Sequence, residues 1–260
     1  MKPSFVTAIA TAATMDRNTL HRQYLGAGLA LLLGLSAGSV CQAQAQTATP
    51  ARPVPDTIAQ RVLACTVCHG KEGRATNTGY FPRIAGKPAA YLYNQLIHFR
   101  EGRRNYAAMT RLVEHLSDGY LLEIATHFAA LDLPYPLPEG GATPAPVMEL
   151  GRSLVHHGDA QRHIPACIQC HGATMTGVMP ATPGLLGLPR DYVVAQLGAW
   201  QNGTRRAAAP DCMAKIVQNL SAQEVSAVAS WLAAQRIPAA AGAVAAQPIA
   251  RPLDCGSHAP

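Results

Sequence analysis

The chain contains few aromatic and few charged residues. Phe, Trp and Tyr make up 5% of its 260 residues, and Asp, Glu, Lys and Arg make up 14%. Aromatic side chains supply much of the apolar bulk of a folded core. The chain therefore has few large apolar side chains with which to build an ordinary core of this size. It also has no stripe of basic residues interleaved with aromatics, which argues against a nucleic-acid partner.

A long uninterrupted apolar run is also lacking. The apolar stretch over residues 25–40 is interrupted by glycine and is shorter than the roughly 20 residues that a membrane-spanning helix needs. Basic residues precede it, and Ala43-Gln44-Ala45 follows as an A-x-A cleavage site. We therefore predict a secretory signal peptide over residues 1–45, cleaved near Ala45, with Met15 as an alternative start. Peripheral association with a membrane is left open.

A short motif occurs twice in the chain. Cys65-Thr66-Val67-Cys68-His69 and Cys167-Ile168-Gln169-Cys170-His171 both read C-x-x-C-H, the attachment signature of c-type haem. The two thiols can form thioethers with one porphyrin, and the adjacent imidazole becomes the proximal iron ligand. Half a zinc site or a thioredoxin-like pair also contains C-x-x-C, but the His and the absence of a βαβ pattern weaken both. We predict two covalent haem c groups, which would supply the missing apolar bulk.

The two motifs belong to an internal duplication. Matched positions stay 101 to 104 residues apart: Cys65 and Cys167, Tyr91 and Tyr192, Gln95-Leu96 and Gln196-Leu197, Gly102 and Gly203, Leu116-Ser117 and Leu220-Ser221, Pro134 and Pro238. Apolar periodicity predicts helices over residues 88–101 and 147–156, and helices that begin after Ser117 and Ser221, where Glu224 completes a capping box. The fold class that we predict is all-α, with two tandem domains that each wrap around one haem.

Proline and glycine mark the domain boundaries. Five prolines and two glycines fall between Pro134 and Pro146, a composition typical of a linker. The predicted divisions are a first domain over residues 46–134, a linker over 135–146, a second domain over 147–238 and a C-terminal tail over 239–260.

The function of each haem depends on its sixth ligand, because an iron closed on both sides transfers electrons and an open iron binds gas or reacts. Met109 lies 40 residues after His69, and Met213 lies 42 residues after His171. Each Met precedes its matched Leu-Ser pair by seven residues. We predict that Met109 and Met213 are the axial ligands opposite His69 and His171, with core packing as the alternative role.

Several other residues compete for the irons. Met175 and Met179 follow His171 by only 4 and 8 residues, so they are poor candidates and are expected to line the haem loop. Three first-domain histidines are expected on the surface or between helices: His98, His115 and His127. A basic cluster is expected as a solvated helix end, or as a contact to a propionate or an acidic partner: Arg100, Arg103 and Arg104.

Two prolines are candidates to orient the proximal imidazoles. Pro82 follows His69 by 13 residues, and Pro183 follows His171 by 12. Because proline has no N–H, its carbonyl is free to accept the Nδ1–H of the ring. An ordinary turn role is the alternative for both prolines.

Two cysteines lie outside the motifs and the predicted signal peptide, Cys212 and Cys255. In an oxidising compartment they suggest a disulfide that ties the tail to the Met213 loop. The alternatives are two free thiols, or Cys212 in place of Met213 as an iron ligand. A thiolate would lower that iron's potential sharply and separate the two haems.

Further sequence marks surround these positions: Cys65-x-x-Cys68-His69-Gly70, Phe81-Pro82-Arg83-Ile84-Ala85-Gly86, Tyr91-Leu92-x-x-Gln95-Leu96, Gly102-Arg103-Arg104, Met109 with Leu116-Ser117, and, in the second half, Leu150-Gly151, Gly158-Asp159 and Ile164-Pro165-Ala166-Cys167. With these marks, residues 55–238 resemble the di-haem cytochromes c of the cytochrome c4 family, each half being similar to a class I cytochrome c domain. The resemblance implies a periplasmic electron shuttle with His/Met ligands at both irons. The family often has Pro close before the axial Met, where this chain has Ala108 and Cys212.

We therefore expect an electron-transfer protein rather than an enzyme. It would take single electrons from a respiratory complex or dehydrogenase in the periplasm and pass them to a terminal oxidase or reductase. One alternative is the cytochrome subunit of a dehydrogenase complex. A di-haem redox enzyme is a weaker alternative, because it needs an open or unusually ligated iron and the sequence offers no additional acid–base constellation.

Overall fold

The computed structural model describes residues 54–75, 79–135, 137–138, 142–238, 242–245 and 251–258. The chain divides into Met1–Arg52 and a compact unit, Pro53–Pro260, to which all of these described residues belong. The predicted signal peptide lies outside the described residues, as do parts of the predicted linker and tail. The domain boundaries given above therefore stay predictions.

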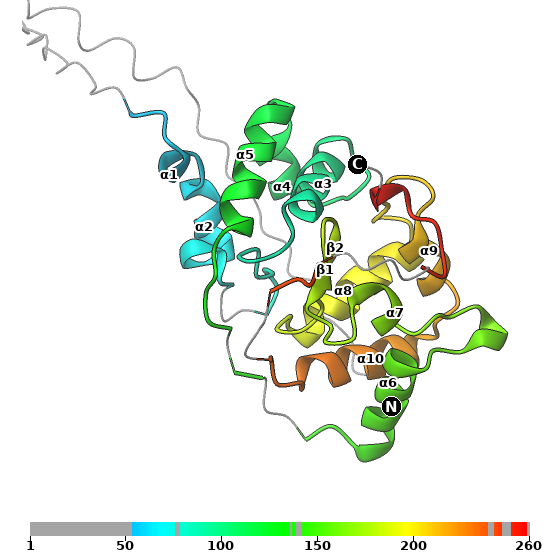
Figure 1. Ribbon diagram of the computed structural model, residues 1–260. Coiled ribbons are helices and arrows are strands. Elements are labelled where there is room, and N and C mark those ends of the chain that lie inside the picture. The colour runs from blue at the N-terminus through cyan, green and yellow to red at the C-terminus, as the bar shows by residue number, and fades with distance from the viewer. Residues whose placement is uncertain are drawn as a thin grey trace, which may run out of the picture. The chain divides into compact units, whose positions relative to one another are not determined.

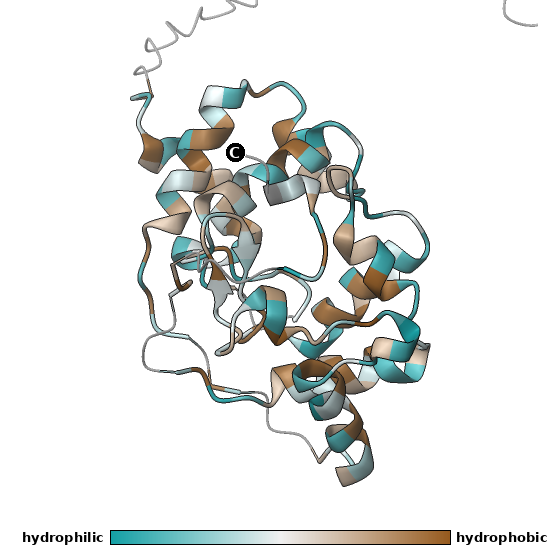
Figure 2. Cartoon of the chain, turned by 45° about the vertical axis from the view of Figure 1, so that its right-hand side comes forward, coloured by the Kyte–Doolittle hydropathy of each residue, from teal (hydrophilic) through white to brown (hydrophobic). Residues whose placement is uncertain are grey.

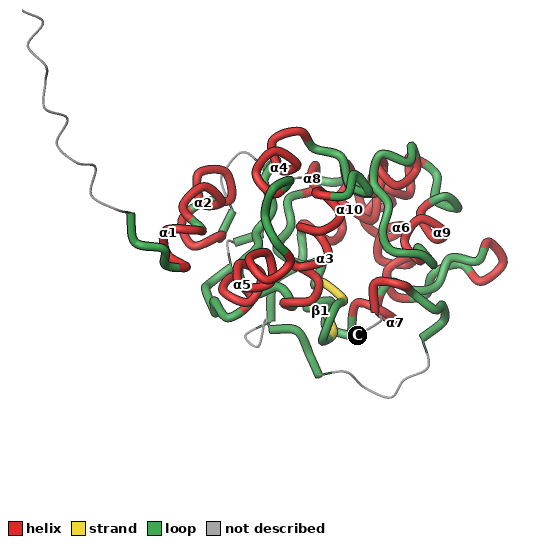
Figure 3. Tube along the Cα trace, turned by 90° about the horizontal axis from the view of Figure 1, so that it is seen from above, coloured by secondary structure: helices red, strands yellow, loops and turns green. Residues whose placement is uncertain are grey.

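Helices dominate the described chain, as predicted (Figures 1 and 3). The first half contains α1 (Ile58–Arg61), α2 (Leu63–His69), the 3-10 turn η1 (Lys71–Gly73), α3 (Ala89–Arg100), α4 (Ala107–Val113) and α5 (Asp118–Ala129). The second half contains α6 (Ala145–His156), η2 (Ala160–Arg162), α7 (Ile168–His171), α8 (Arg190–Gln201), α9 (Cys212–Val217) and α10 (Ala222–Ala233), followed by η3 (Gly256–His258). Each C-x-x-C-H motif ends at a helix C-terminus, because its His is the last residue of α2 or α7.

One two-stranded hairpin was not expected from the sequence. Strand β1 (Gly177–Val178) pairs antiparallel with β2 (Thr182–Pro183) in the loop after the second motif. Strands of two residues are too short to show the alternation of apolar and polar residues that identifies a strand in a sequence. The hairpin carries Pro183 and thereby fixes the loop that follows His171.

The helices pack in pairs around apolar cores. In the second half α6 and α8 pack against α10 (Figure 1), and in the first half α3 packs against α5. Gly151 permits the close approach of α6 to α10, since a Cβ there would lie 2.3 Å from the carbonyl oxygen of Ala227. Hydrophobic and hydrophilic residues both occur within most helices (Figure 2), as is typical of helices with one buried face.

The start of α10 confirms the predicted capping box. The Ser221 side chain accepts from the backbone N–H of Glu224, and the Glu224 carboxylate accepts from the backbone N–H of Ser221. Arg162 also donates to Glu224, with Nη2 at 2.5 Å from Oε1. Hydrogen bonding from Arg162 is the main cause that lowers the pKa of Glu224 to about 2, and the Ser221 N–H adds to it.

We expect Glu224→Gln to reduce the free energy of unfolding at pH 7 by about 1 kcal/mol, the usual contribution of a helix N-cap interaction. The carboxylate's contribution is fully present above its unfolded-state pKa, near 4.5, and is lost as the pH falls toward 2. Denaturant unfolding of the haem-loaded protein at several pH values, followed by circular dichroism, measures the difference. Glu149→Gln, which removes an exposed carboxylate paired with Arg152, is the control and should have a smaller effect. A deficit that does not change with pH would contradict the account.

Candidate functional site

Both halves line one continuous cavity of about 650 Å³. This volume lies within the range of natural cofactor sites. The cavity wall contains all eight residues that the sequence predicts as cofactor ligands: Cys65, Cys68, His69, Met109, Cys167, Cys170, His171 and Met213. Residues more than a hundred positions apart are thus brought to the wall of one cavity.

The two imidazoles are held in one orientation by proline carbonyls. His69 Nδ1 donates to the Pro82 carbonyl oxygen at 2.8 Å, and His171 Nδ1 donates to the Pro183 oxygen at 2.8 Å. A carbonyl can only accept, so the proton lies on Nδ1 and the Nε2 lone pair is left for a metal. Burial lowers the pKa of both rings, which keeps them neutral and able to coordinate iron.

Burial disfavours the thiolate form at three of the four motif cysteines. Burial raises the pKa of Cys65 and Cys170, and it raises the pKa of Cys167 to about 11. Thioredoxin-like cysteines instead need a lowered thiol pKa. In the described part of the chain, no three His, Cys, Asp or Glu side chains are grouped as a metal site. Thiols that line a cavity beside a fixed imidazole suit thioether attachment of a haem.

A thioether from each half also lines the cavity. Met109, on α4, is half-buried and packs against the core formed by Phe99, Val113 and Leu121. Met213, on α9, is half-buried and packs against the core of the second half. Each half therefore supplies two thiols, one fixed imidazole and one thioether to the cavity wall, which is the complete donor set of a His/Met haem c.

The rival ligands lie elsewhere. None of the three histidines is among the residues that line the cavity, and the same holds for the two other methionines: His98, His115, His127, Met175 and Met179. Met175 is 2% exposed and belongs to the second-half core, whereas Met179 is 40% exposed. Both methionines lie in the loop between α7 and α8, after the second motif, and neither is among the residues that line the cavity.

A pair of buried arginines joins the two halves at the cavity. Arg104 Nη2 donates to the Tyr192 hydroxyl at 2.9 Å and to Gln196 Oε1 at 2.7 Å. Arg205 Nη2 donates to Gln95 Oε1 at 3.0 Å, and its Nη1 donates to Gln196 Oε1 at 2.9 Å. Arg104 Nη1 also reaches Gln95, at 3.1 Å. Each guanidinium thus contacts one glutamine from each half.

The contacts across the interface are reciprocal, because the arginine and the glutamine of one half are the repeat equivalents of those in the other half. Arg104 matches Arg205 and Gln95 matches Gln196, each 101 positions apart. The backbones also meet here, since Arg104 and Arg205 form an antiparallel bridge and the Asn105 N–H donates to the Thr204 carbonyl at 3.1 Å. The interface therefore has the self-complementary pattern of a two-fold dimer within one chain.

The predicted solvated helix end is wrong for Arg104, which is 9% exposed and contacts the second half. Arg100 instead contacts Leu116 O and Asp118, and Arg103 pairs with Glu101. Sequence reasoning missed the role of Arg104, although an available signal was that Gly102 and Gly203 are each followed by Arg two residues later.

Lys87 is a second cation that sequence reasoning missed. It is 4% exposed and lines the cavity, and its Nζ donates to the carbonyl oxygen of Gly184 in the other half at 2.9 Å. The repeat has Leu188 at the equivalent position. Burial, together with the charge of Arg83, lowers the Lys87 pKa to about 7. Cations at this wall suit the propionates that a haem brings into the cavity.

The predicted disulfide is present. Cys212 and Cys255 are bonded, with their Cα atoms 5.4 Å apart. The alternatives of two free thiols, or of Cys212 as an iron ligand, are therefore excluded in this structure.

The chain is similar to known electron-transfer proteins. It is 35% identical over 173 residues to the thiosulfate dehydrogenase electron acceptor of Thiomonas intermedia, a match that covers 65% of this chain and 77% of the relative. It is 32% identical over 177 residues to cytochrome c4 of Pseudomonas aeruginosa, covering 66% of this chain and 84% of the relative. The crystal structure of reduced recombinant cytochrome c4 from Pseudomonas stutzeri matches with a TM-score of 0.60 and 25% identity, covering 70% of this chain and 100% of that one. No protein-family model matches the chain.

Arg104→Met and Arg205→Met should each lower the free energy of unfolding by roughly 1 kcal/mol, because each removes hydrogen bonds at the interface while the remaining arginine still donates to Gln95 and Gln196. The double variant should lose more than the sum of the single losses, since only the removal of both arginines takes both of these donors away from Gln95 and Gln196. Denaturant unfolding followed by circular dichroism measures all three variants. Arg111→Met, at an exposed position, is the matched control. Additive losses, or losses no greater than the control's, would show that the arginine pair does not hold the halves together.

Proposed function

The chain belongs to the di-haem cytochrome c4 family, and we propose that it carries single electrons between redox proteins of the periplasm. As in its family, it is an electron-transfer protein with two class I cytochrome c domains and two covalently attached haem c groups. The observation that carries the proposal is the cavity whose wall combines, from each half, a C-x-x-C-H motif with a Met.

This donor set supports an assignment of four iron ligands. His69 and Met109 would hold the first iron, and His171 and Met213 the second. Haem iron supplies reversible one-electron oxidation and reduction, and an imidazole with a thioether favours the ferrous form and a high potential. The carbonyls of Pro82 and Pro183 keep each imidazole in one orientation, and the surrounding apolar cores would keep water from bound irons. Such rigid sites support electron transfer because the ligands need little rearrangement.

Electron exchange within the chain would take place across the Arg104–Arg205 interface. The support for this step is that one cavity is lined by both motifs and by both arginines. The shared hydrogen bonds to Gln95 and Gln196 hold the halves in one relative position. Buried guanidinium groups also suit the propionate charges that would otherwise repel each other across the cavity.

The proposed donor is a thiosulfate dehydrogenase. The support for it is the name of the relative from Thiomonas intermedia, an electron acceptor of that enzyme. The same name also favours the second candidate function, a cytochrome that stays associated with a dehydrogenase. A terminal oxidase or reductase as acceptor stays a prediction. Among the described residues, no helix is long and apolar enough to span a membrane.

Replacement of either axial Met should open one haem. Met109→Leu and Met213→Leu preserve side-chain volume but remove the sulfur, so each ferrous variant should bind carbon monoxide at one haem, and the double variant at both. Carbon monoxide difference spectra measure the uptake. Met179→Leu removes an exposed methionine outside the cavity wall and should leave both haems closed. Closed haems in either axial variant would show that another group is the sixth ligand.

A stopped-flow experiment tests the donor. The oxidised protein is mixed with a purified thiosulfate dehydrogenase and thiosulfate, and the haem absorbance is followed; the mixture without thiosulfate is the control. We expect both haems to become reduced at a rate that falls with added salt, because charged surfaces steer redox partners together. If ascorbate reduces both haems but the enzyme with thiosulfate does not, the proposed donor is wrong. The proposal that the protein transfers electrons would not be affected by that result.

A further inference from the structure

The C-terminal segment 251–258 lies against the second half next to α9 (Figure 1). Leu253, Cys255 and Ser257 from this segment line the same cavity as the haem ligands. The segment comes more than a dozen residues after the end of the last repeat helix, at Ala233. It is therefore an addition to the duplicated fold, and the repeat itself does not explain it.

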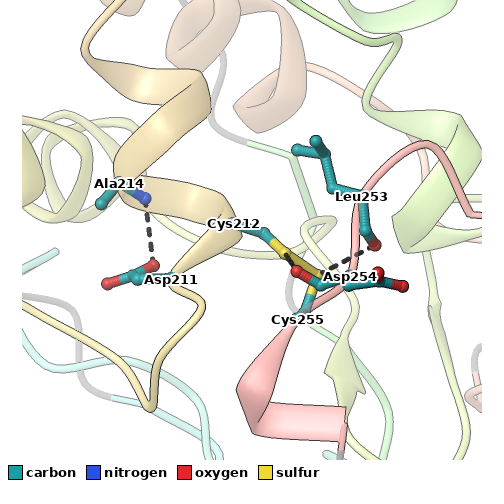
Figure 4. Close-up of a disulfide and its surroundings, with 6 residues drawn as sticks. All are labelled: Asp211, Cys212, Ala214, Leu253, Asp254 and Cys255. Carbon is teal, nitrogen blue, oxygen red and sulfur yellow. Dashed lines mark hydrogen bonds between the residues drawn. A yellow bond between two sulfur atoms is a disulfide. The ribbon is translucent and has the colours of Figure 1, made fainter.

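A disulfide fastens this segment beside the axial Met of the second half. Cys212 is the first residue of α9, directly before Met213, and it is bonded to Cys255 (Figure 4). The backbone also approaches closely here, because the Gly256 N–H donates to the Pro210 carbonyl at 3.0 Å. A Cβ at Gly256 would lie 2.1 Å from the Ala209 carbonyl oxygen, so only glycine fits.

Asp211 holds the same end of α9 from inside the fold. Its Oδ1 accepts from the Ala214 N–H at 3.0 Å and caps the helix (Figure 4). Its Oδ2 accepts from the Trp200 indole at 3.2 Å and from the Ala207 N–H at 2.6 Å. Met213 therefore lies on a helix end that is held both by a cap and by a covalent cross-link.

The equivalent helix of the first half has neither device. The N-cap of α4 is Tyr106, which makes no side-chain capping hydrogen bond. The repeat equivalents of Asp211 and Cys212 are Ala107 and Ala108. The two methionines occupy matched positions in the repeat, but only Met213 is held in this way.

We propose that segment 251–258 is a brace that keeps Met213 at the second haem, so that the second iron retains its thioether under conditions in which the first iron exchanges Met109 for another ligand. The inference rests on the proposed His/Met ligation. An incoming ligand must displace Met213 from the iron. The free energy of that displacement includes the free energy needed to move the N-terminal end of α9, which carries Met213. A cross-link removes much of the conformational freedom gained by that movement. Cys212 and Cys255 are thus positioning residues.

A second anchor ties the brace to the first half. Asn94 Nδ2, on α3, donates to the Ser257 carbonyl oxygen at 3.1 Å. This contact does not involve α9, so it distinguishes a general packing role of the segment from a role in holding Met213. If the segment holds Met213, loss of the disulfide should make Met213 easier to displace from the iron, and loss of the Asn94 contact should not.

Titration of the ferric haem-loaded protein with imidazole tests the brace. The near-infrared sulfur-to-iron band reports bound Met, and the Met109→Leu background restricts that band to the second haem. We expect Cys212→Ala/Cys255→Ala to lower the imidazole concentration that displaces Met213 by about tenfold or more, consistent with the usual effect of a disulfide. Asn94→Ala should change the imidazole concentration that displaces Met213 by less than about twofold. An unchanged concentration in the cysteine variant, or an equal shift in Asn94→Ala, would overturn the brace.

The test keeps the brace apart from the proposed ligation. If the wild-type band does not account for both haems, the His/Met assignment fails before any variant is compared. If the cysteine variant does not fold, the Met109→Leu protein is treated with a phosphine, which takes up oxygen from water as the disulfide gains two electrons and two protons to become two thiols. Alkylation of those thiols and reoxidation with ferricyanide should then give the same tenfold shift. No shift after complete alkylation would overturn the brace.

Discussion

Both halves of the fold are built around one cavity, and its wall contains every residue that the sequence predicts as a cofactor ligand. The apolar cores of the two halves surround this space of about 650 Å³, and a chain with 5% aromatic residues has few large side chains with which to fill it. In this family the haems fill that space, so the cofactor is part of the hydrophobic core as well as the redox centre. Covalent attachment, which we propose through the four motif cysteines, would make this part of the core permanent.

The duplication explains how two such sites fit in one chain. Each half repeats the motif helix, the proline carbonyl that fixes the imidazole, and the short helix that carries the Met. The surfaces that meet are also repeat equivalents, so Arg104 and Arg205 use the same two glutamines from opposite sides. A single interface therefore joins the two halves, and under the proposed ligation it would also set how the two haems lie relative to each other. The halves differ in Lys87 and in the disulfide, and under the same proposal these differences would distinguish one haem from the other.

Sequence reasoning succeeded where the signal is local or repeated. The motif fixes Cys65, Cys68 and His69 within one turn of helix. Matched spacing predicted Met109 and Met213 as iron ligands; the structure places both on the cavity wall, and their ligation of iron stays a prediction. The role of Pro82 followed from the missing N–H of proline. Contacts that depend on how the halves approach each other were harder to predict, and the Arg that follows both Gly102 and Gly203 by two residues was a sign of them that was missed. Arginine and lysine are usually exposed residue types. Only the packing of the two halves shows that Arg104 and Lys87 are buried.

The central claim is that a Met sulfur closes each haem opposite its fixed imidazole. The most direct measurement is the near-infrared spectrum of the purified ferric protein, quantified per haem, with carbon monoxide then added to the ferrous form. The account predicts a sulfur-to-iron charge-transfer band sized for two haems and no carbon monoxide uptake. A band sized for one haem, or uptake at either iron, would contradict it and favour a redox enzyme with an open site.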